Sequence, residues 1–340
     1  MVILQISAAM FLVMAVGWVA RRRGYFSPET TRSLSRFVVD VAFPALVFVQ
    51  LFKTVDASAL RERWYIPLLG AALILSGHLV GTVTAPLFAA REKRRTFTFL
   101  VGMSNWVYLP LPITEALYGW EGIQTVLLVN IGGQVVLWTV IVGSLRGGRP
   151  NGETLRNLLL NPGLWATALG IGLALCAPGL KGCLEMRVAE APAGVLAVKA
   201  ILQPLELVGS ITIPLSLVVI GAQLEDAQLE DAARAGNATA GLLPRFDRGV
   251  IGVLLARLFV APLVFVALVL ALSHSGARML ANPVEACCIM AAMPSAVSCG
   301  MFVERFGGDT SLAARAVLYT TFVALLSVPA LFALFLGLGL

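Results

Sequence analysis

Long apolar segments separated by short polar ones form the dominant pattern of this chain. A helix that spans a bilayer needs about 20 mostly apolar residues, and ten segments of this kind can be counted along the sequence. They cover residues 2–20, 34–53, 64–90, 97–118, 121–145, 158–177, 200–222, 250–272, 284–305 and 312–338. The pattern predicts an all-α integral membrane protein with ten transmembrane helices.

Two of the expected helices, the fourth and the ninth, carry proline near their middle. Pro110 and Pro112 interrupt the fourth, which also contains Asn105, and Pro294 interrupts the ninth. Proline removes a backbone donor and clashes with the preceding turn, so these helices must break or kink. Broken backbone at bilayer depth is tolerated only where it is buried in protein or lines a cavity. The pair therefore indicates a transporter binding site.

The two halves of the chain can be laid over each other as an internal repeat. Phe43-Pro44-Ala45-Leu46 corresponds to Ile213-Pro214-Leu215-Ser216, and Tyr118-Gly119 corresponds to Phe306-Gly307. Five helices per half is an odd number, so the halves must insert with opposite topology. We expect a first repeat at 1–145, a linker at 146–157 and a second repeat at 158–340, with helices 4 and 9 crossing at their prolines. The polar stretch 225–249 is predicted to be a solvated loop.

Basic residues are unevenly distributed between the two sets of loops. Loops after odd-numbered helices hold 17 Lys and Arg residues, whereas the other loops hold 7. The positive-inside rule places the odd-numbered loops in the cytoplasm. We therefore expect both termini on the non-cytoplasmic side.

Composition excludes several classes of function. Apolar residues make up 58% of the chain and charged residues 13%, with a mean hydropathy of +0.87, so a large soluble domain is excluded. The net charge is +6, but the Lys and Arg residues lie between apolar segments and are not interleaved with aromatic residues, which argues against a nucleic-acid partner. The five cysteines show no CxxC spacing and the two histidines no HExxH, so we expect no metal and no cofactor. GxSxG and GxxxxGK are also absent, which argues against an enzyme.

An anion site is the chemistry that two broken helices favour. Each break exposes unpaired N–H groups carrying roughly +0.5 charge at the start of the second half-helix. The candidates for substrate contact at the breaks are Asn105, Tyr108, Pro110, Pro112, Pro294, Ser295 and Ser298. Asn130 and Gln134 lie four residues apart, on one face of the fifth helix, and Gln50 is a further candidate. Hydrogen bonds between helices, or back to the helix backbone, are the alternative role for these polar groups.

Ionisable residues inside the expected spans are candidates for coupling or for structural ion pairs. They are Asp40, Glu115, Arg257 and His78. Asp40 could carry a coupling proton or be solvated, and Glu115 is equally open. Arg257 is expected to pair with an acid of a neighbouring helix, and His78 to be a hydrogen-bonded core histidine. The absence of two adjacent acids at mid-membrane argues against a sodium/proton antiporter.

Several of these motifs, taken in order, resemble the auxin efflux carrier family, which includes the plant PIN carriers and bacterial malonate carriers. The resemblance covers nearly the whole chain. It rests on Asn105 to Pro112 with Leu117-Tyr118-Gly119, on Gln134 with Trp138 and Thr139, on Asn161-Pro162, on Pro214 with Gly221, and on Met293-Pro294 with Glu304-Arg305-Phe306-Gly307. Pro110, Glu115 and Cys299 depart from the pattern of the plant members, and the long central loop of those members is missing.

The resemblance, which extends to bacterial members, implies a carrier of small organic anions in the bacterial inner membrane that works by alternating access, usually as a homodimer. It implies a scaffold of helices 1, 2, 6 and 7, and a transport domain of helices 3–5 and 8–10. Carboxylates of an auxin-like or dicarboxylate kind are the expected substrates, although the missing loop argues against auxin itself. A proton- or sodium-coupled symporter of the bile-acid type, and a receptor or channel that does not transport, remain the alternatives.

Overall fold

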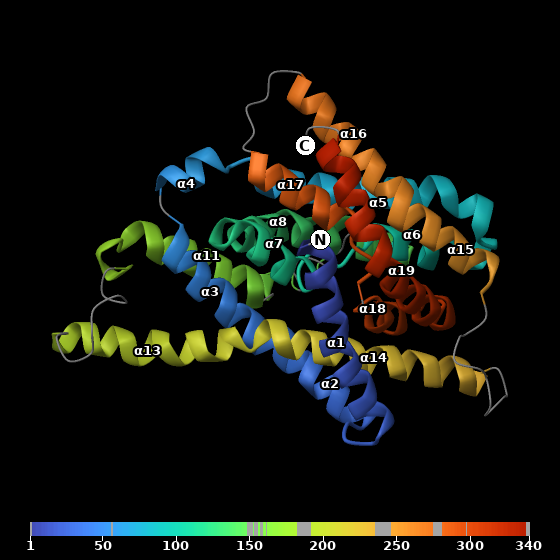
Figure 1. Ribbon diagram of the computed structural model, residues 1–340, viewed down its shortest axis with the longest axis horizontal. Coiled ribbons are helices and arrows are strands. Elements are labelled where there is room, and N and C mark those ends of the chain that lie inside the picture. The colour runs from blue at the N-terminus through green and yellow to red at the C-terminus, as the bar shows by residue number, and fades with distance from the viewer. Residues whose placement is uncertain are drawn as a thin grey trace.

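Helices account for nearly all regular structure in the computed structural model (Figure 1). The structure describes residues 2–55, 57–147, 152, 156, 159–160, 162–181, 192–234, 246–274, 281–296 and 298–337. Most of the expected linker 146–157, together with Asn161 and Cys183, lies outside the described residues, as do the side chains of Glu304 and Arg305. Within the described part, extended residues pair only in an isolated bridge between Ser104 and Ser295.

The first half of the chain folds into helices that include two π-helical turns. The elements are α1 (Val2–Arg22), α2 (Pro28–Phe37), η1 (Val38–Ala42), α3 (Phe43–Thr54), α4 (Ala57–Glu62), α5 (Ile66–Phe88), η2 (Arg91–Lys93), α6 (Arg94–Gly102), α7 (Pro110–Tyr118), α8 (Trp120–Val136), η3 (Leu137–Ile141) and α9 (Val142–Arg146). The π turns η1 and η3 continue into the helices on either side of them, so each lies inside a longer helical segment.

The second half is built in the same way and contains a third π turn. Its elements are α11 (Pro162–Cys176), α13 (Ala193–Ser210), α14 (Thr212–Arg234), α15 (Arg248–Leu255), η5 (Ala256–Val260), α16 (Ala261–His274), α17 (Ala281–Ala291), α18 (Cys299–Phe306) and α19 (Thr310–Gly337). In Figure 1, α13 and α14 follow one another along one side of the molecule.

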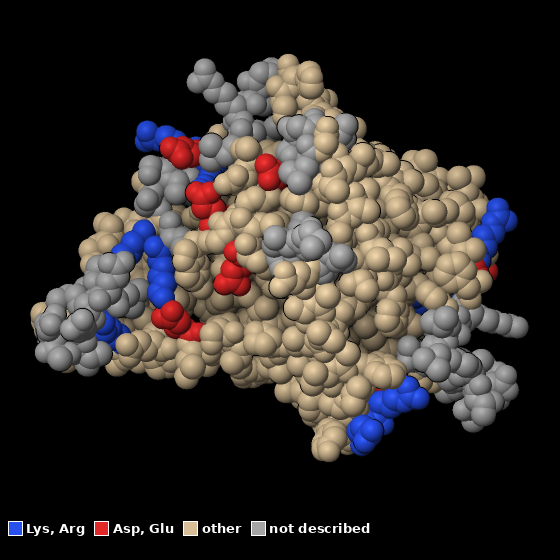
Figure 2. Space-filling view, viewed as in Figure 1, with Lys and Arg blue, Asp and Glu red and all other residues tan. Residues whose placement is uncertain are grey.

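Six helical segments in the described part are long and apolar enough to cross a membrane, which makes this an integral membrane protein. They are Pro28–Lys53, Ile66–Phe88, Trp120–Arg146, Gly194–Asp226, Arg248–His274 and Thr310–Phe335. Figure 2 shows a surface of the same character, in which most of the visible face is uncharged and basic side chains form small groups at its margins. The ten-span arrangement and the inverted repeat stay predictions.

Close helix contacts hold two groups of elements together. The α1 helix packs along α14, while α3 packs against α11 and α13. At Gly17 the approach of α1 to α14 is so close that a Cβ atom would lie 1.9 Å from the Val218 carbonyl oxygen. Small residues at such crossings let helix backbones pack closely in lipid. In the other group, α5 packs against both α6 and α8.

One sequence expectation is wrong in part. The polar stretch 225–249 was expected to be a loop, but α14 continues as a helix through Arg234. Arg21 of α1 forms an ion pair with Asp226 at 2.7 Å, and Glu225 is buried at 5% exposure. Because these acids pack against α1, tertiary contacts support a helical turn that the polar sequence alone did not predict.

Candidate functional site

The two interrupted helices meet at their breaks. The first interruption, residues 103–109, separates α6 from α7, and the second, residues 292–296 and 298, separates α17 from α18. The Asn105 N–H donates to the Pro294 carbonyl at 2.8 Å, and the Ala296 N–H donates to the Met103 carbonyl at 2.9 Å. Backbone groups that a break leaves without helical partners must bond elsewhere. Here each interruption supplies partners for the other, and we call this contact the crossing.

Side chains of the crossing add local hydrogen bonds. Asn105 is buried, and its Oδ1 accepts from the Tyr108 N–H at 3.2 Å, just before α7 begins. Ser295 donates to the Leu100 carbonyl at 2.8 Å. Ser104 is fully buried, and its Oγ has no hydrogen-bond partner among the described residues. Of the two serines of the bridge, Ser295 therefore forms a hydrogen bond within the fold, whereas the Ser104 hydroxyl has no partner among the described residues.

A cavity of about 450 Å³ reaches the crossing. Its lining combines residues of the first interruption with residues of η1, α3, α8, η3 and α11 and with a few from the second interruption and α18. The lining residues are Val39, Asp40, Phe43, Met103, Ser104, Asn105, Trp106, Val107, Tyr108, Asn130, Gln134, Leu137, Trp138, Leu160, Pro162, Gly163, Ala296, Ser298 and Phe302. Asp40 is the one charged side chain among them, so the described lining contains no cation.

Aromatic rings and amides give the cavity its chemical character. Trp106 Nε1 donates to Asn130 Oδ1 at 3.1 Å, and Gln134 Nε2 lies 3.5 Å from the same oxygen. Phe43 packs edge-on against Tyr108 with ring centroids 5.7 Å apart, and Trp138 lies 5.7 Å from Phe302 by the same measure. The lining is thus largely aromatic and apolar, with polar groups from the crossing (Ser104, Asn105, Ser298) and from α8 (Asn130, Gln134).

A smaller cavity of about 50 Å³ adjoins the same point. It shares Asn105, Tyr108 and Ser298 with the larger cavity and adds polar side chains of α2 and α14, namely Ser35, Ser216 and Gln223. The crossing therefore adjoins both a large aromatic cavity and a small one.

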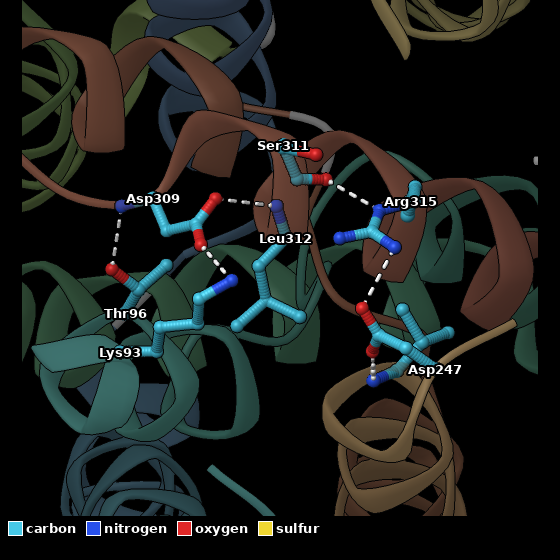
Figure 3. Close-up of polar contacts among 8 residues, drawn as sticks. Lys93, Thr96, Asp247, Asp309, Ser311, Leu312 and Arg315 are labelled. Atoms are coloured by element: carbon cyan, nitrogen blue, oxygen red, sulfur yellow. Dashed lines mark hydrogen bonds and ion pairs between the residues drawn. The ribbon is translucent and has the colours of Figure 1, made fainter. Parts of the chain in front are cut away.

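Two further contacts join the interrupted helices away from the crossing. At the end of α7, the Tyr118 hydroxyl donates to Glu285 of α17 at 2.8 Å. At the opposite ends, Asp309 caps α19 by accepting from the Leu312 N–H at 2.9 Å and pairs with Lys93 at 2.9 Å (Figure 3). Burial raises the pKa of the Asp309 carboxyl, but the Leu312 N–H and the Lys93 ammonium outweigh it and hold that pKa below its ordinary value.

A second aspartate lies beside this contact (Figure 3). Asp247 accepts from the Val250 N–H at 3.0 Å, which caps α15, and from Arg315 Nη1 at 2.7 Å. An aspartate at a helix N-terminus satisfies backbone donors that have no partner within the helix. Each acid therefore begins one helix while bonding to a basic residue of another element.

The comparison with known proteins is consistent with this geometry. The model of the family described as membrane transport protein matches residues 2–154 and 149–332. The chain belongs to this family. An uncharacterized transporter of Methanothermobacter thermautotrophicus is 23% identical over 328 residues, 94% of each chain. A second uncharacterized transporter, from Methanocaldococcus jannaschii, is 22% identical over 151 residues, 44% of this chain and 48% of the relative.

Membership of the membrane transport protein family makes this chain a membrane transporter and confirms the resemblance to the auxin efflux carriers. The family is one of transporters rather than enzymes. Within the described residues, no group of three or more His, Cys, Asp or Glu side chains is placed to hold a metal ion.

Sequence candidates of this transporter fall into two sets by position. Asn105, Tyr108, Asn130, Gln134, Ser298 and Asp40 line the large cavity. The other candidates lie outside its lining: Pro110, Pro112, Pro294, Ser295, Gln50, Glu115, Arg257 and His78. Pro110 and Pro112 lie in the first turn of α7, and Pro294 and Ser295 form hydrogen bonds at the crossing. Gln50 lies on α3, and Glu115 is exposed. His78 lies on α5 against Gly102. Their part in binding stays a prediction.

Sequence reasoning missed most of the aromatic lining and misjudged the partner of Arg257. Phe43, Trp106 and Phe302 were not named as site residues, because an aromatic residue in an apolar span normally signals packing. Arg257 was expected to pair with an acid, but its hydrogen bonds go to the carbonyls of Val101 and Ala291. No property of the local sequence around Arg257 distinguishes a carboxylate partner from a carbonyl partner.

Proposed function

We propose that this transporter carries a small organic anion by alternating access, with the carboxylate held at the crossing. The observation that carries the proposal is the cavity of about 450 Å³, which ends at the crossing. Ligand pockets of this size, mostly apolar with a few placed polar groups, are typical of small-molecule sites.

A carboxylate suits the polar end of the cavity. The α7 and α18 helices both begin at the crossing, and the N-terminus of a helix favours an anion through its dipole. Asn105 and Ser298 line the cavity there and can donate to carboxylate oxygens, and the unpartnered Ser104 hydroxyl supplies a third donor. Such a site needs no cation among the side chains that line the cavity itself.

The walls favour one carboxylate with an aromatic or branched apolar body. Phe43, Trp106, Trp138 and Phe302 provide flat surfaces on which such a body packs. A second carboxylate would have to enter an apolar cavity that already contains the acid Asp40, and like charges repel there. We therefore favour an aromatic monocarboxylate over a dicarboxylate such as malonate.

Transport requires the site to change its access, and the lining is consistent with two parts that move against each other. Asp40, Phe43 and Pro162 belong to the expected scaffold of helices 1, 2, 6 and 7. The remaining lining comes mainly from the expected transport domain of helices 3–5 and 8–10. A ten-helix inverted repeat with rigid-body movement of this domain, in a homodimer with non-cytoplasmic termini, completes the proposal.

Asp40 favours a second candidate mechanism, symport of the anion with a proton. Its carboxylate lines the cavity and is exposed, and it lies in the π turn η1. Such turns are frequent at functional sites. A proton on Asp40 would reduce repulsion of the substrate anion, which would couple the two.

Uptake into proteoliposomes tests the proposal. Labelled phenylacetate, malonate and the neutral phenylacetamide are compared, each with and without proton or sodium gradients. We expect saturable phenylacetate uptake with counterflow, weaker malonate uptake and no saturable uptake of the amide. Stimulation by an inward proton gradient would favour coupling through Asp40, and indifference to gradients would favour a uniporter.

The alternatives give different results in the same system. Flux that does not saturate and shows no counterflow would indicate a channel. Phenylacetate binding without flux would indicate a receptor, and preference for malonate would overturn the monocarboxylate assignment.

A further inference from the structure

Arg257 is the largest fully buried side chain in the described part of the protein, with 1% of its surface exposed. It lies in η5, inside the helical segment Arg248–His274. Its Nη1 donates to the Val101 carbonyl at 2.9 Å, and its Nη2 donates to the Ala291 carbonyl. Val101 and Ala291 belong to the last turns of α6 and α17. One guanidinium therefore binds the C-terminal ends of α6 and α17, which are the first halves of the two interrupted helices.

The charge of Arg257 has no acidic partner among the described residues. The ion pairs of that part of the chain involve Arg21, Lys53, Arg63, Lys93 and Arg315 instead. The Nε atom of Arg257 has no hydrogen-bond partner there either. Burying a cation without a counter-charge is costly. The negative C-terminal ends of α6 and α17 must therefore offset much of the cost of desolvating the guanidinium.

The half-helix dipoles show what this arrangement does. The C-terminal ends of α6 and α17 carry about −0.5 charge each, and the N-terminal ends of α7 and α18 about +0.5 each. All four ends meet near the crossing, so without a side chain their charges cancel. A crossing of two broken helices has, by itself, little preference for anions.

We propose that Arg257 is a positioning residue that turns this neutral crossing into an anion site. Its positive charge neutralises the ends of α6 and α17, which leaves the ends of α7 and α18 unopposed. The inference rests on the proposed transport of an anion at the crossing, and it names the residue that gives the crossing its charge preference.

The neighbourhood of Arg257 fits this role. Met103 and Ser104 line the cavity and follow Val101 by only two and three residues, so the cation acts over a short distance. On α5, Gly77 leaves room for the contact, since a Cβ there would lie 3.0 Å from Arg257 Nη1 and 3.0 Å from the Val101 carbonyl oxygen. The packing therefore holds the guanidinium against the helix end and away from water.

A cysteine at Ser298, which lines the cavity, measures the field without any substrate. Purified Ser298→Cys protein is treated with an anionic and a cationic methanethiosulfonate of similar size, and the ratio of the two modification rates is taken. Protein without the introduced cysteine gives the background to subtract. We expect Arg257→Gln to lower the anion-to-cation ratio by at least about fivefold, and Arg257→Lys to keep it within about twofold, because only the first removes a charge.

A second variant removes the net charge while keeping the arginine. Cys299 is buried, and its Sγ donates to the Met103 carbonyl at 3.8 Å, two residues after the Val101 carbonyl that Arg257 binds, so Cys299→Asp places a carboxylate near the guanidinium. We expect the same fall in ratio, and this variant decides the question if Arg257→Gln does not give folded protein. Arg315→Gln is the matched control, since Arg315 is also buried but already paired with Asp247.

An unchanged ratio in either folded charge-removing variant would overturn the inference, as would an equal fall in Arg257→Lys or in Arg315→Gln. The measurement is independent of transport. If Arg257→Gln lowers the ratio but phenylacetate is not carried, the inference stands and the proposed substrate fails. If phenylacetate is carried and the ratio does not change, the proposed substrate stands and the inference about Arg257 fails.

Discussion

The two interruptions have matched backbones and unequal side chains. Each follows a half-helix whose C-terminal carbonyl binds Arg257, and each donates one backbone hydrogen bond to the other. Yet Met103 to Tyr108 all line the large cavity, whereas the second interruption contributes Ala296 and Ser298. The first interruption supplies most of the polar and aromatic groups at the crossing, and the second supplies two small residues.

Size explains why the division is uneven. A backbone bridge between Ser104 and Ser295 requires close approach, and close approach in a membrane favours small side chains. The larger rings of the first interruption pack elsewhere: Trp106 lies against Gly133 of α8, where a Cβ atom would be 2.9 Å from its Nε1, and Tyr108 packs against Phe43. A matched backbone can thus support a one-sided site.

The largest effect expected from this comparison is that of Asn105→Ala. The change removes the amide that lines the cavity and the acceptor of the Tyr108 N–H. Loss of the acceptor leaves the Tyr108 N–H without its partner, which costs about 1–3 kcal/mol, so transport efficiency should fall roughly 10- to 100-fold. Initial rates of uptake over a range of substrate concentrations measure it.

Ser295→Ala is the matched control on the other interruption. Its hydroxyl bonds to the Leu100 carbonyl and does not line the cavity. We expect a loss of about 1 kcal/mol in stability and less than about a threefold change in transport. Equal transport losses in the two variants would remove the distinction between the interruptions.

Next in size is the effect of Trp106→Phe. An aromatic ring of smaller size is kept, but the hydrogen bond that orients Asn130 is lost, so KM should rise about three- to tenfold. Trp138→Phe is the control, because Trp138 lines the same cavity and its Nε1 has no partner among the described residues. A larger rise in KM for Trp138→Phe would contradict the assigned role of the Trp106 hydrogen bond.

Tyr118→Phe tests the contact between the interrupted helices at the end of α7. The variant keeps the ring and loses the hydrogen bond to Glu285. Because the pair is partly exposed, we expect a loss of about 1 kcal/mol in the free energy of unfolding. Thermal unfolding of the purified protein measures it, and Tyr25→Phe at an exposed position should have no effect.

The smallest expected effect is that of Asp309, and it depends on pH. Its folded pKa is lowered, with burial opposing and the Leu312 N–H and Lys93 outweighing it. The carboxylate therefore contributes stability above its unfolded pKa of about 3.9, and this is lost as pH falls through the lower folded pKa. Asp309→Asn should cost less than about 1 kcal/mol at pH 7, and the difference from the parent should vanish well below pH 4. A difference independent of pH would show that the charge is not the cause.

Much of the architecture follows from the sequence alone. Pro110, Pro112 and Pro294 locate both breaks, because proline cannot continue a helix ladder. The apolar segments indicate a membrane protein, because uncharged stretches of about 20 residues match the bilayer. Asn105, Asn130 and Gln134 could be singled out because polar side chains are rare inside apolar spans.

Tertiary structure decided the rest, because it depends on groups that are far apart in the chain. The partners of Asn105 and Ala296 at the crossing lie almost 200 residues away, and the carbonyls bound by Arg257 belong to two other helices. Phe43, Trp106 and Phe302 become a cavity wall only when three separate segments pack together. An aromatic residue or a buried arginine has the same local sequence signature whether it packs or lines a site, and only its neighbours in space distinguish the two.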